Sequence, residues 1–470
     1  MEHSSVVLMT LIVYKIILIT IGVVASRKNK NETDFFLGGR GLGPWVASLS
    51  ASASSSSAWT LLGVSGAAYA WGLSALWLFP ACLGGFLLNW YVLAPKLRRA
   101  SHEFQAVTVT DILIHGKSEK WRNRLAGLAS FIILFSILFY VASQFQGSGK
   151  TFQGSFDMSP TQSILLGSAI IMFYTMLGGF WAVSLTDSLQ GLVMAATAIF
   201  LPAGALIAVG GFSGFQEALT QVDAPGFSNI FQNRAWPAAF GFVFGLMGIG
   251  LGYPGQPHVV NRFMALKDEA SVVMGRRIAI AWAVIVYSGM IVLGLCGRML
   301  YPELGDAEMV FLAVASDHFH PIFSGIMIAG VLSATMSTAD SQLLVAASAI
   351  TRDIPWITIK NPLRFSRIVV VFLSFGAVLV ALYGTNEIFS KVLFAWTAMG
   401  SAFGPLLLVT VFRGSVRGKF ALAAMALGFG LSVLAYSFPE TRGTWWERVA
   451  PFVVSLVFAW LGTRGKEVEA

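Results

Sequence analysis

The sequence has few charged residues and almost no cysteine. Only 11% of its 470 residues are charged and 56% are hydrophobic, whereas about 25% of the residues in a soluble domain are charged. The two cysteines, Cys82 and Cys296, lie in apolar runs, so neither a disulfide framework nor a metal site is predicted. No GxxxxGK[ST] loop, HExxH motif or nucleophile elbow occurs, which argues against ATP-driven transport and against an enzyme.

Long apolar runs recur along the whole chain instead, with a mean hydropathy of +0.72. They predict an all-α integral membrane protein with a single domain, 1–470, in the lipid bilayer. The first run is followed by no small-residue cleavage pattern, so it is interpreted as a retained helix. Thirteen spans are expected, roughly at 5–26, 43–66, 72–95, 122–149, 161–179, 185–210, 236–253, 277–301, 322–346, 366–384, 388–412, 419–437 and 447–463.

The net charge of +8 comes from basic residues in short loops between these spans. When the loops are assigned alternately to two sides, most of the 31 Lys and Arg residues fall on one side. This pattern predicts a multi-pass protein of the inner (plasma) membrane, with the N-terminus outside and the C-terminus cytoplasmic. Because the charges form no continuous basic face, no nucleic-acid partner is expected, and no obligate protein partner is evident.

The segment Ser48–Thr60, SLSASASSSSAWT, places seven serines and a threonine inside an apolar region. Serine hydroxyls compete with backbone hydrogen bonds and tolerate local unwinding. A broken, buried helix of this kind exposes carbonyls and hydroxyls to a small cation, as in transporters. The alternative is close packing of helices through small residues.

Two carboxylates fall within predicted spans, where ionisable groups are usually functional. Asp187 lies in GGFWAVSLTDSLQG, and Asp340 lies in SATMSTADSQLL. The alternative for each is an interfacial carboxylate that faces water or pairs with a cytoplasmic arginine.

Around Asp340, the residues Ser333, Ser337 and Ser341 are four apart and share one helical face, which Ala334 and Thr338 flank. Such hydroxyls supply the hard oxygen ligands that hard cations prefer. A joint sodium site between this span and Ser48–Thr60 is therefore plausible.

Two further segments are rich in helix-breaking residues. Gly248–Pro257, GIGLGYPGQP, predicts non-helical backbone beside a substrate cavity, with Tyr253 as a wall residue, or else simply the end of a span. Ala398–Pro405, AMGSAFGP, predicts another break.

These segments resemble the sodium:solute symporter family, and its sodium/proline branch in particular. The resemblance runs from about Phe35 to Pro405 and rests on FFLGGRGLGPWVASLSASASSSSAW, GGFWAVSLTDSLQG, GLGYPGQPHVVNRFMAL, STADSQLLVAASAITRD and GSAFGP. It implies a LeuT-type core of two inverted five-helix repeats, roughly 43–210 and 236–412, with peripheral helices at 5–26, 419–437 and 447–463.

The resemblance also implies roles for individual residues. Sodium would be bound by the backbone carbonyls of Ala53, Ser56 and Ala334 and the hydroxyls of Ser337 and Thr338. Coupling or a second ion is assigned to Asp187, Ser341 and Asp340. Substrate positions are Ser55, Ser57, Tyr140, Gln144, Ile249, Tyr253 and Pro257, and Arg40 is linked to transport.

The expected function is sodium-coupled import of a small organic solute, proline or a related amino acid, by alternating access. Two positions depart from the proline branch: Ser55 replaces an aspartate and Ile249 replaces a tryptophan. A sodium symporter for a carboxylate or vitamin-like solute therefore remains an alternative. Separate alternatives are a transporter-like solute sensor and proton coupling through Asp187.

Overall fold

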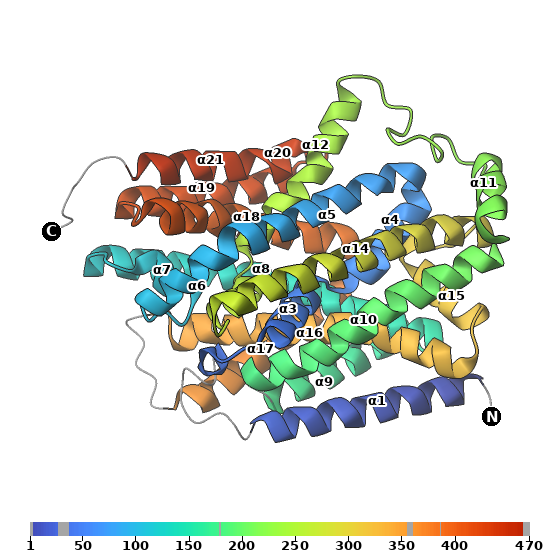
Figure 1. Ribbon diagram of the computed structural model, residues 1–470, viewed down its shortest axis with the longest axis horizontal. Helices are drawn as coiled ribbons and strands as arrows, with labels where there is room; N and C mark the ends of the chain where they lie inside the picture. Colours follow the sequence, from blue (N-terminus) through green and yellow to red (C-terminus); the bar gives the residue numbers. More distant parts are fainter. Residues whose placement is uncertain (1–2, 27–36, 178–179, 355–360, 386, 464–470) are drawn as a thin grey trace.

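The computed structural model describes residues 3–26, 37–177, 180–354, 361–385 and 387–463. Within these ranges the chain is helical and contains no strand, only one isolated bridge between Leu42 and Leu266. Long helices run side by side in one bundle (Figure 1). Ten helical segments of the described residues are long and apolar enough to cross a membrane. The all-α membrane architecture is thus confirmed, while the count of thirteen spans stays a prediction.

Most of the bundle consists of long, uninterrupted helices. They are α1 (His3–Ser26), α8 (Glu119–Phe156), α9 (Pro160–Leu177), α10 (Phe180–Ala208), α14 (Glu269–Leu300), α16 (Pro321–Thr351), α17 (Pro362–Tyr383), α18 (Ile388–Arg413), α19 (Gly418–Ser437) and α21 (Ala450–Leu461). Shorter helices cover the two ends. They are α6 (Ala94–Glu103) and α7 (Val109–Ile114) at one end, α11 (Gly211–Gln221) and α15 (Val310–Asp317) at the other, and α20 (Trp445–Arg448) before α21.

The serine-rich segment is a broken helix, as its composition predicted. Helix α3 (Pro44–Ser55) begins with proline at its first turn and ends at Ser56, whose φ and ψ of −119° and 86° are not helical. A wide turn (η2, Trp59–Gly63) then leads into α4 (Val64–Trp71). The chain continues in helical conformation through η3 (Gly72–Trp77), α5 (Leu78–Leu87) and η4 (Leu88–Leu93) into α6.

The glycine- and proline-rich segment is a second break, as predicted. Helix α12 (Ala238–Leu251) ends there, η5 (Tyr253–Gly255) follows, and α13 begins at Pro257 and runs to Met264. A Cβ on Gly255 would lie 2.6 Å from the Cα of Gly400 in α18. Glycine therefore allows the backbone of the break to contact α18 directly.

The break expected at Ala398–Pro405 is wrong, because α18 is continuous through this segment and contains Pro405 in its interior. A proline frees the carbonyl four residues earlier, here that of Ser401. That carbonyl faces Gly428 of α19, where a Cβ would lie only 2.2 Å from the oxygen. Glycine at position 428 thus lets α19 approach this turn of α18 closely.

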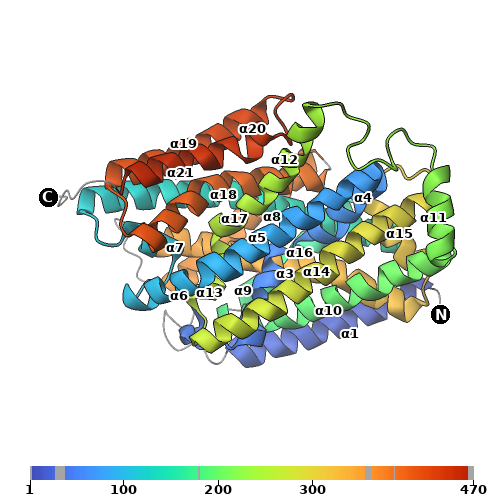
Figure 2. The same ribbon diagram turned by 45° about the horizontal axis from the view of Figure 1, so that its top comes forward.

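Helix α16 lies at the centre of the bundle, buried along most of its length. It packs against α1, α3, α8, α10 and α17, while α3 also packs against α10 and α14. Helices α1 on one side and α19 with α21 on the other are peripheral (Figure 2). The two predicted cation-binding segments, α3 and α16, are therefore neighbours in the core.

Candidate ion and solute site

The broken end of α3 and the middle of α16 are joined by direct hydrogen bonds. The Ser337 hydroxyl donates to the carbonyl of Ala53 at 3.1 Å, and the Thr338 hydroxyl donates to the carbonyl of Ser54 at 3.2 Å. All four residues are buried. The contact brings together segments 284 residues apart in the chain.

The other predicted sodium ligands lie in the same cluster. The carbonyl of Ala334 accepts from Ser337 at 3.4 Å, and the backbone N–H of Ser56 donates to the carbonyl of Ala53 at 3.2 Å. The Ser56 hydroxyl is buried without a hydrogen-bond partner among the described residues. The cluster consists of uncharged carbonyl and hydroxyl oxygens, which are hard ligands suited to a monovalent cation.

A buried ion pair lies beside this cluster. The Asp187 Oδ2 of α10 accepts from Arg262 Nη2 of α13 at 3.0 Å, and the side chains of the two residues are only 0% and 1% exposed. The same oxygen accepts from the hydroxyls of Ser50 at 2.8 Å and Ser54 at 3.1 Å. Arg262 Nη2 also donates to the Ser341 hydroxyl at 2.5 Å. One carboxylate and one guanidinium thus connect α3, α10, α13 and α16.

Sequence reasoning missed Arg262. Its only signal was its position in HVVNRFMAL, directly after the break at Pro257. The alternation of loops assigns Arg262 to the basic residues of a cytoplasmic loop. The structure buries it instead, because α13 turns back into the core and directs the guanidinium at Asp187, 75 residues earlier in the chain.

Asp340 lies on a different face of α16 from Asp187 and its partners. Its Oδ1 accepts a hydrogen bond from the Thr175 hydroxyl of α9, whereas its Oδ2 has no partner in the described residues. On the neighbouring turns of α16, Ser333 bonds the Tyr14 hydroxyl at 2.5 Å and Met336 contacts the ammonium of Lys15, both from α1. Asp340 therefore belongs to the contact between α16 and the outer helices α1 and α9.

Several predicted substrate residues form an aromatic wall next to the second break. The ring of Tyr253 lies 4.7 Å from that of Trp396, and its hydroxyl bonds the Tyr287 hydroxyl at 2.8 Å. The carbonyl of Ile249 accepts from the indole nitrogen of Trp396 at 3.1 Å, and Tyr140 lies 6.4 Å from the same indole ring. Trp396 is a second residue that the sequence did not reveal, because it lies in an apolar run of α18 with no local signal.

The remaining predicted positions lie in two places: Ser55, Ser57 and Gln144 at the break of α3, and Pro257 at the second break. Gln144 Oε1 accepts from the N–H of Ala58 at 3.0 Å, which places α8 against the break in α3, and Ser57 accepts from the N–H of Trp59 at 3.2 Å. Ser55 donates within α3 to Ser52 at 2.9 Å, and Pro257 is buried at the start of α13.

Arg40 is not brought into the site. It precedes α3 and bonds the side chain of Gln105 at 3.0 Å and the carbonyl of Ala106 at 2.9 Å, at the end of the bundle that carries α6 and α7. Any effect of Arg40 on transport therefore acts at this end rather than at the ion cluster.

Comparisons with known proteins agree with this arrangement. The model of the sodium:solute symporter family matches residues 35–428. The osmoregulated proline transporter OpuE of Bacillus subtilis is 33% identical over 96% of this chain and 93% of its own length. The sodium/proline symporter of Escherichia coli is 34% identical over 93% of this chain and 88% of its own.

Solved structures agree on the fold. A Na⁺-coupled sialic acid symporter in a substrate-bound, outward-open state matches 97% of both chains with a TM-score of 0.80 at 17% identity. The nucleobase-cation-symport-1 family transporter Mhp1 matches with a TM-score of 0.59 at 14% identity.

The family model and the curated relatives place the chain in one class: membrane transporters that couple solute movement to a cation, not enzymes. Within that class, the chain belongs to the sodium:solute symporter family. Its cation is sodium, and its partners are sodium and a small-molecule solute.

Proposed function

We propose that this protein imports proline, or a closely related amino acid, together with sodium. The observation that carries the proposal is the contact of the α3 break with α16, where Ser337 and Thr338 reach the carbonyls of Ala53 and Ser54. The relatives named as proline transporters, which match nearly the whole chain, support the choice of solute.

Sodium takes the place of the hydrogen bonds that join α3 and α16 in this cluster, and the hydroxyls keep their protons. The carbonyls of Ala53, Ser56 and Ala334 and the hydroxyls of Ser337 and Thr338 turn their oxygens to the ion and fix α3 against α16. The solute lies beside them, against Tyr140, Gln144, Ile249, Tyr253 and Pro257, with Ser55 and Ser57 at the break. Because both ligands favour the same arrangement of α3, each raises the affinity for the other.

The Asp187–Arg262 pair transmits the state of the ion cluster to α10 and α13. Ser54 links the two regions directly, since its carbonyl accepts from Thr338 and its hydroxyl donates to Asp187. Ser341 bonds both Arg262 and Ser54 and belongs to the same coupling set. Asp340, whose Oδ2 has no partner among the described residues, is the candidate for a second ion.

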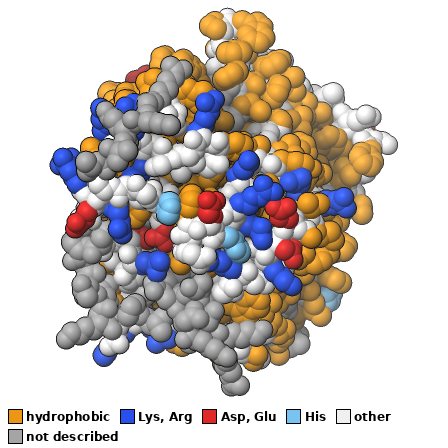
Figure 3. Space-filling model, turned by 60° about the vertical axis from the view of Figure 1, so that its left-hand side comes forward, with side chains coloured by type: hydrophobic (Ala, Val, Ile, Leu, Met, Phe, Trp, Pro, Cys, Tyr) orange, Lys and Arg blue, Asp and Glu red, His pale blue; other side chains and the backbone are white. Residues whose placement is uncertain are grey.

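The N-terminus lies outside and the C-terminus lies in the cytoplasm. Lys and Arg side chains are spread over the end of the molecule that carries α6 and α7 (Figure 3), which supports a cytoplasmic face there. Two inverted repeats, 43–210 and 236–412, form the single domain. The breaks near Ser56 and Tyr253, each early in its half, support this division.

A sodium symporter for a carboxylate or a vitamin-like solute is the second candidate. It is favoured by Ile249, since the aromatic residue of the proline branch is aliphatic in this chain. A thermal-shift screen of amino acids and small carboxylates, with and without sodium, separates the two: proline stabilises the protein under the first proposal and a carboxylate does so under the second.

Uptake of proline into proteoliposomes tests the mechanism. An inward sodium gradient drives accumulation, and an inside-negative potential of 100 mV adds about 2.3 kcal/mol per charge moved. The double variant Ser337→Ala, Thr338→Ala loses sodium-driven uptake. The control Ser348→Ala, whose hydroxyl bonds Val345 within its own helix, keeps it. Uptake by the wild type that does not depend on sodium contradicts the proposal.

A further inference from the structure

A lysine lies near the middle of the apolar, peripheral helix α1. Lys15 lines a cavity of about 630 Å³ between α1, α9 and α16, and its ammonium lies 5.9 Å from the centre of the adjacent Tyr14 ring. The other described residues that line the cavity are apolar, except Tyr174. An ionisable side chain at this depth of a membrane is unfavourable unless it pairs with an opposite charge.

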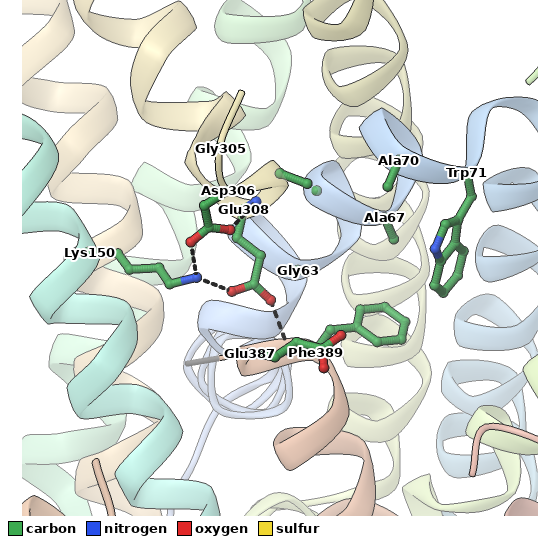
Figure 4. A pocket seen from close by; sticks show the side chains of 12 residues that line it. Gly63, Ala67, Ala70, Trp71, Lys150, Gly305, Asp306, Glu308, Glu387 and Phe389 are labelled. Carbon is green, nitrogen blue, oxygen red and sulfur yellow. Dashed lines mark hydrogen bonds and ion pairs between the residues drawn. The ribbon is translucent and has the colours of Figure 1, made fainter. Parts of the chain in front are cut away.

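Another ammonium inside the bundle shows how such a charge is satisfied. Lys150 of α8 contacts two carboxylates, Asp306 at 2.6 Å and Glu308 at 2.5 Å (Figure 4). Lys15 has no carboxylate within ion-pair distance among the described residues, and its ammonium contacts the Sδ of Met336 instead. Because a thioether is a weak acceptor, this contact leaves the charge of Lys15 poorly satisfied.

A carboxylate with a free oxygen lies one helical turn from that contact. Met336 and Asp340 are four residues apart in α16 and therefore share one face. Oδ1 of Asp340 accepts from the Thr175 hydroxyl, whereas its Oδ2 is buried without a partner in the described chain. Lys15 and Asp340 are close enough for their charges to attract each other. Because the lysine stem is long and flexible, the ammonium can turn from Met336 to Asp340 while α1 stays in place.

Other cations of the described chain are less suited to Asp340. Arg262 is already paired with Asp187. Arg367 of α17 lines a small cavity next to Asp340, but its side chain is exposed and forms no ion pair with this carboxylate. The negative charge of Asp187 also acts on Asp340, which increases the need for a cation there.

We propose that Lys15 supplies the cation for Asp340. Its ammonium takes the place that a second sodium would have, so the protein binds one sodium, at the contact of α3 with α16. The inference rests on the proposed sodium site and identifies the second ion at Asp340 as part of the chain itself. It also gives α1 a function, because this peripheral helix carries the positive charge that α16 lacks.

The number of bound sodium ions tests the proposal. The Tm of the purified full-length protein is measured against sodium concentration, with potassium keeping the ionic strength constant. At saturating sodium, stabilisation rises with the logarithm of the concentration in proportion to the number of ions bound. We expect the slope of one ion in the wild type, a slope twice as steep in Lys15→Met, and again the slope of one ion in Lys15→Met, Asp340→Asn. Lys15→Arg retains the cation and the wild-type slope.

Thr20→Ala is the matched control in α1, because the exposed Thr20 hydroxyl bonds the carbonyl of Ile16 in its own helix. It keeps the wild-type slope. The proposal is overturned if the wild type shows the slope of two ions, or if Lys15→Met shows the same slope as Thr20→Ala.

The Tm without sodium or solute tests the charge pair by itself. Lys15→Met and Asp340→Asn each lower it, since each leaves one buried charge uncompensated, and the combined variant recovers at least half of the summed loss. Additive losses would overturn the pair. Sodium-driven proline uptake is measured separately, so failure of this pair and failure of the proposed import give different results.

Discussion

At the scale of single residues, the core is organised by charges and hydroxyls that lipid could not solvate. Asp187 and Arg262 are tolerated there because each neutralises the charge of the other, while Ser50, Ser54 and Ser341 supply most of the remaining hydrogen bonds. A buried pair of this kind contributes little net stability, but removing one partner leaves an uncompensated buried charge.

Asymmetric substitution of this pair is therefore costly. We expect Arg262→Met and Asp187→Leu each to lower the free energy of unfolding by about 3–5 kcal/mol, seen as a fall in Tm in detergent. The combined variant recovers most of this loss, while sodium-driven uptake stays absent because the link between α3 and α13 is gone. Additive losses in the combined variant would show that the two charges do not act as a pair.

The sequence predicted features that depend on local composition. The serine-rich segment Ser48–Thr60 and the glycine-rich segment Gly248–Pro257 were both expected to interrupt a helix, and both interruptions are present. Arg262 and Trp396 could not be predicted, because their roles depend on which distant segments pack beside them. The break expected at Ala398–Pro405 is absent, and local composition does not reveal that Gly428 of α19 packs closely against this part of α18.

At the scale of elements, glycine at the second break sets how closely η5 approaches α18. Gly255→Ala places a methyl group 2.6 Å from the Cα of Gly400, so backbone must move. We expect a loss of stability of about 1–3 kcal/mol and weaker solute binding. Gly430→Ala in α19 is the control: a Cβ there meets nothing within 4 Å, and the higher helix propensity of alanine predicts a gain of up to about 1 kcal/mol. Equal Tm shifts would contradict this account.

The end of α16 carries a pH-sensitive contact. Asp353 accepts from Thr108, the N-cap of α7, at 2.8 Å. Burial and the like charge of Asp111 raise the pKa of Asp353 from 3.8 to about 7. The folded protein binds the proton of the Asp353 carboxyl group more tightly than the unfolded chain does. Protonated Asp353 therefore stabilises the fold fully below about pH 4, and this stabilisation is lost as the pH rises through 7.

We therefore expect the Tm to fall more steeply in the wild type than in Asp353→Asn when the pH is raised from 5.5 to 8. The asparagine variant keeps the hydrogen bond from Thr108. The difference in slope between the two proteins therefore measures the effect of losing the proton of Asp353. Asp223→Asn, on an exposed loop, is the control and keeps the wild-type slope. Identical slopes in Asp353→Asn and the wild type would show that deprotonation of Asp353 does not lower the stability over this pH range.

At the scale of the whole molecule, both native cysteines are buried, which makes the orientation measurable. Glu303→Cys lies at the end near α15, and Lys120→Cys lies at the opposite end, at the start of α8. We expect a membrane-impermeant maleimide applied to intact cells to label the first variant and to label the second only after permeabilisation. The reverse pattern would invert the proposed topology.

The ion cluster joins Ala53, Ala334, Ser337 and Thr338 without a formal charge, and the nearby Asp187 is neutralised by Arg262. Under the proposed sodium site, the bound sodium is therefore the net charge that this cluster adds. We then expect the reorientation of the loaded form to be electrogenic and the return of the empty form to depend little on voltage. Hyperpolarisation should accelerate one half of the transport cycle and leave the other half unchanged.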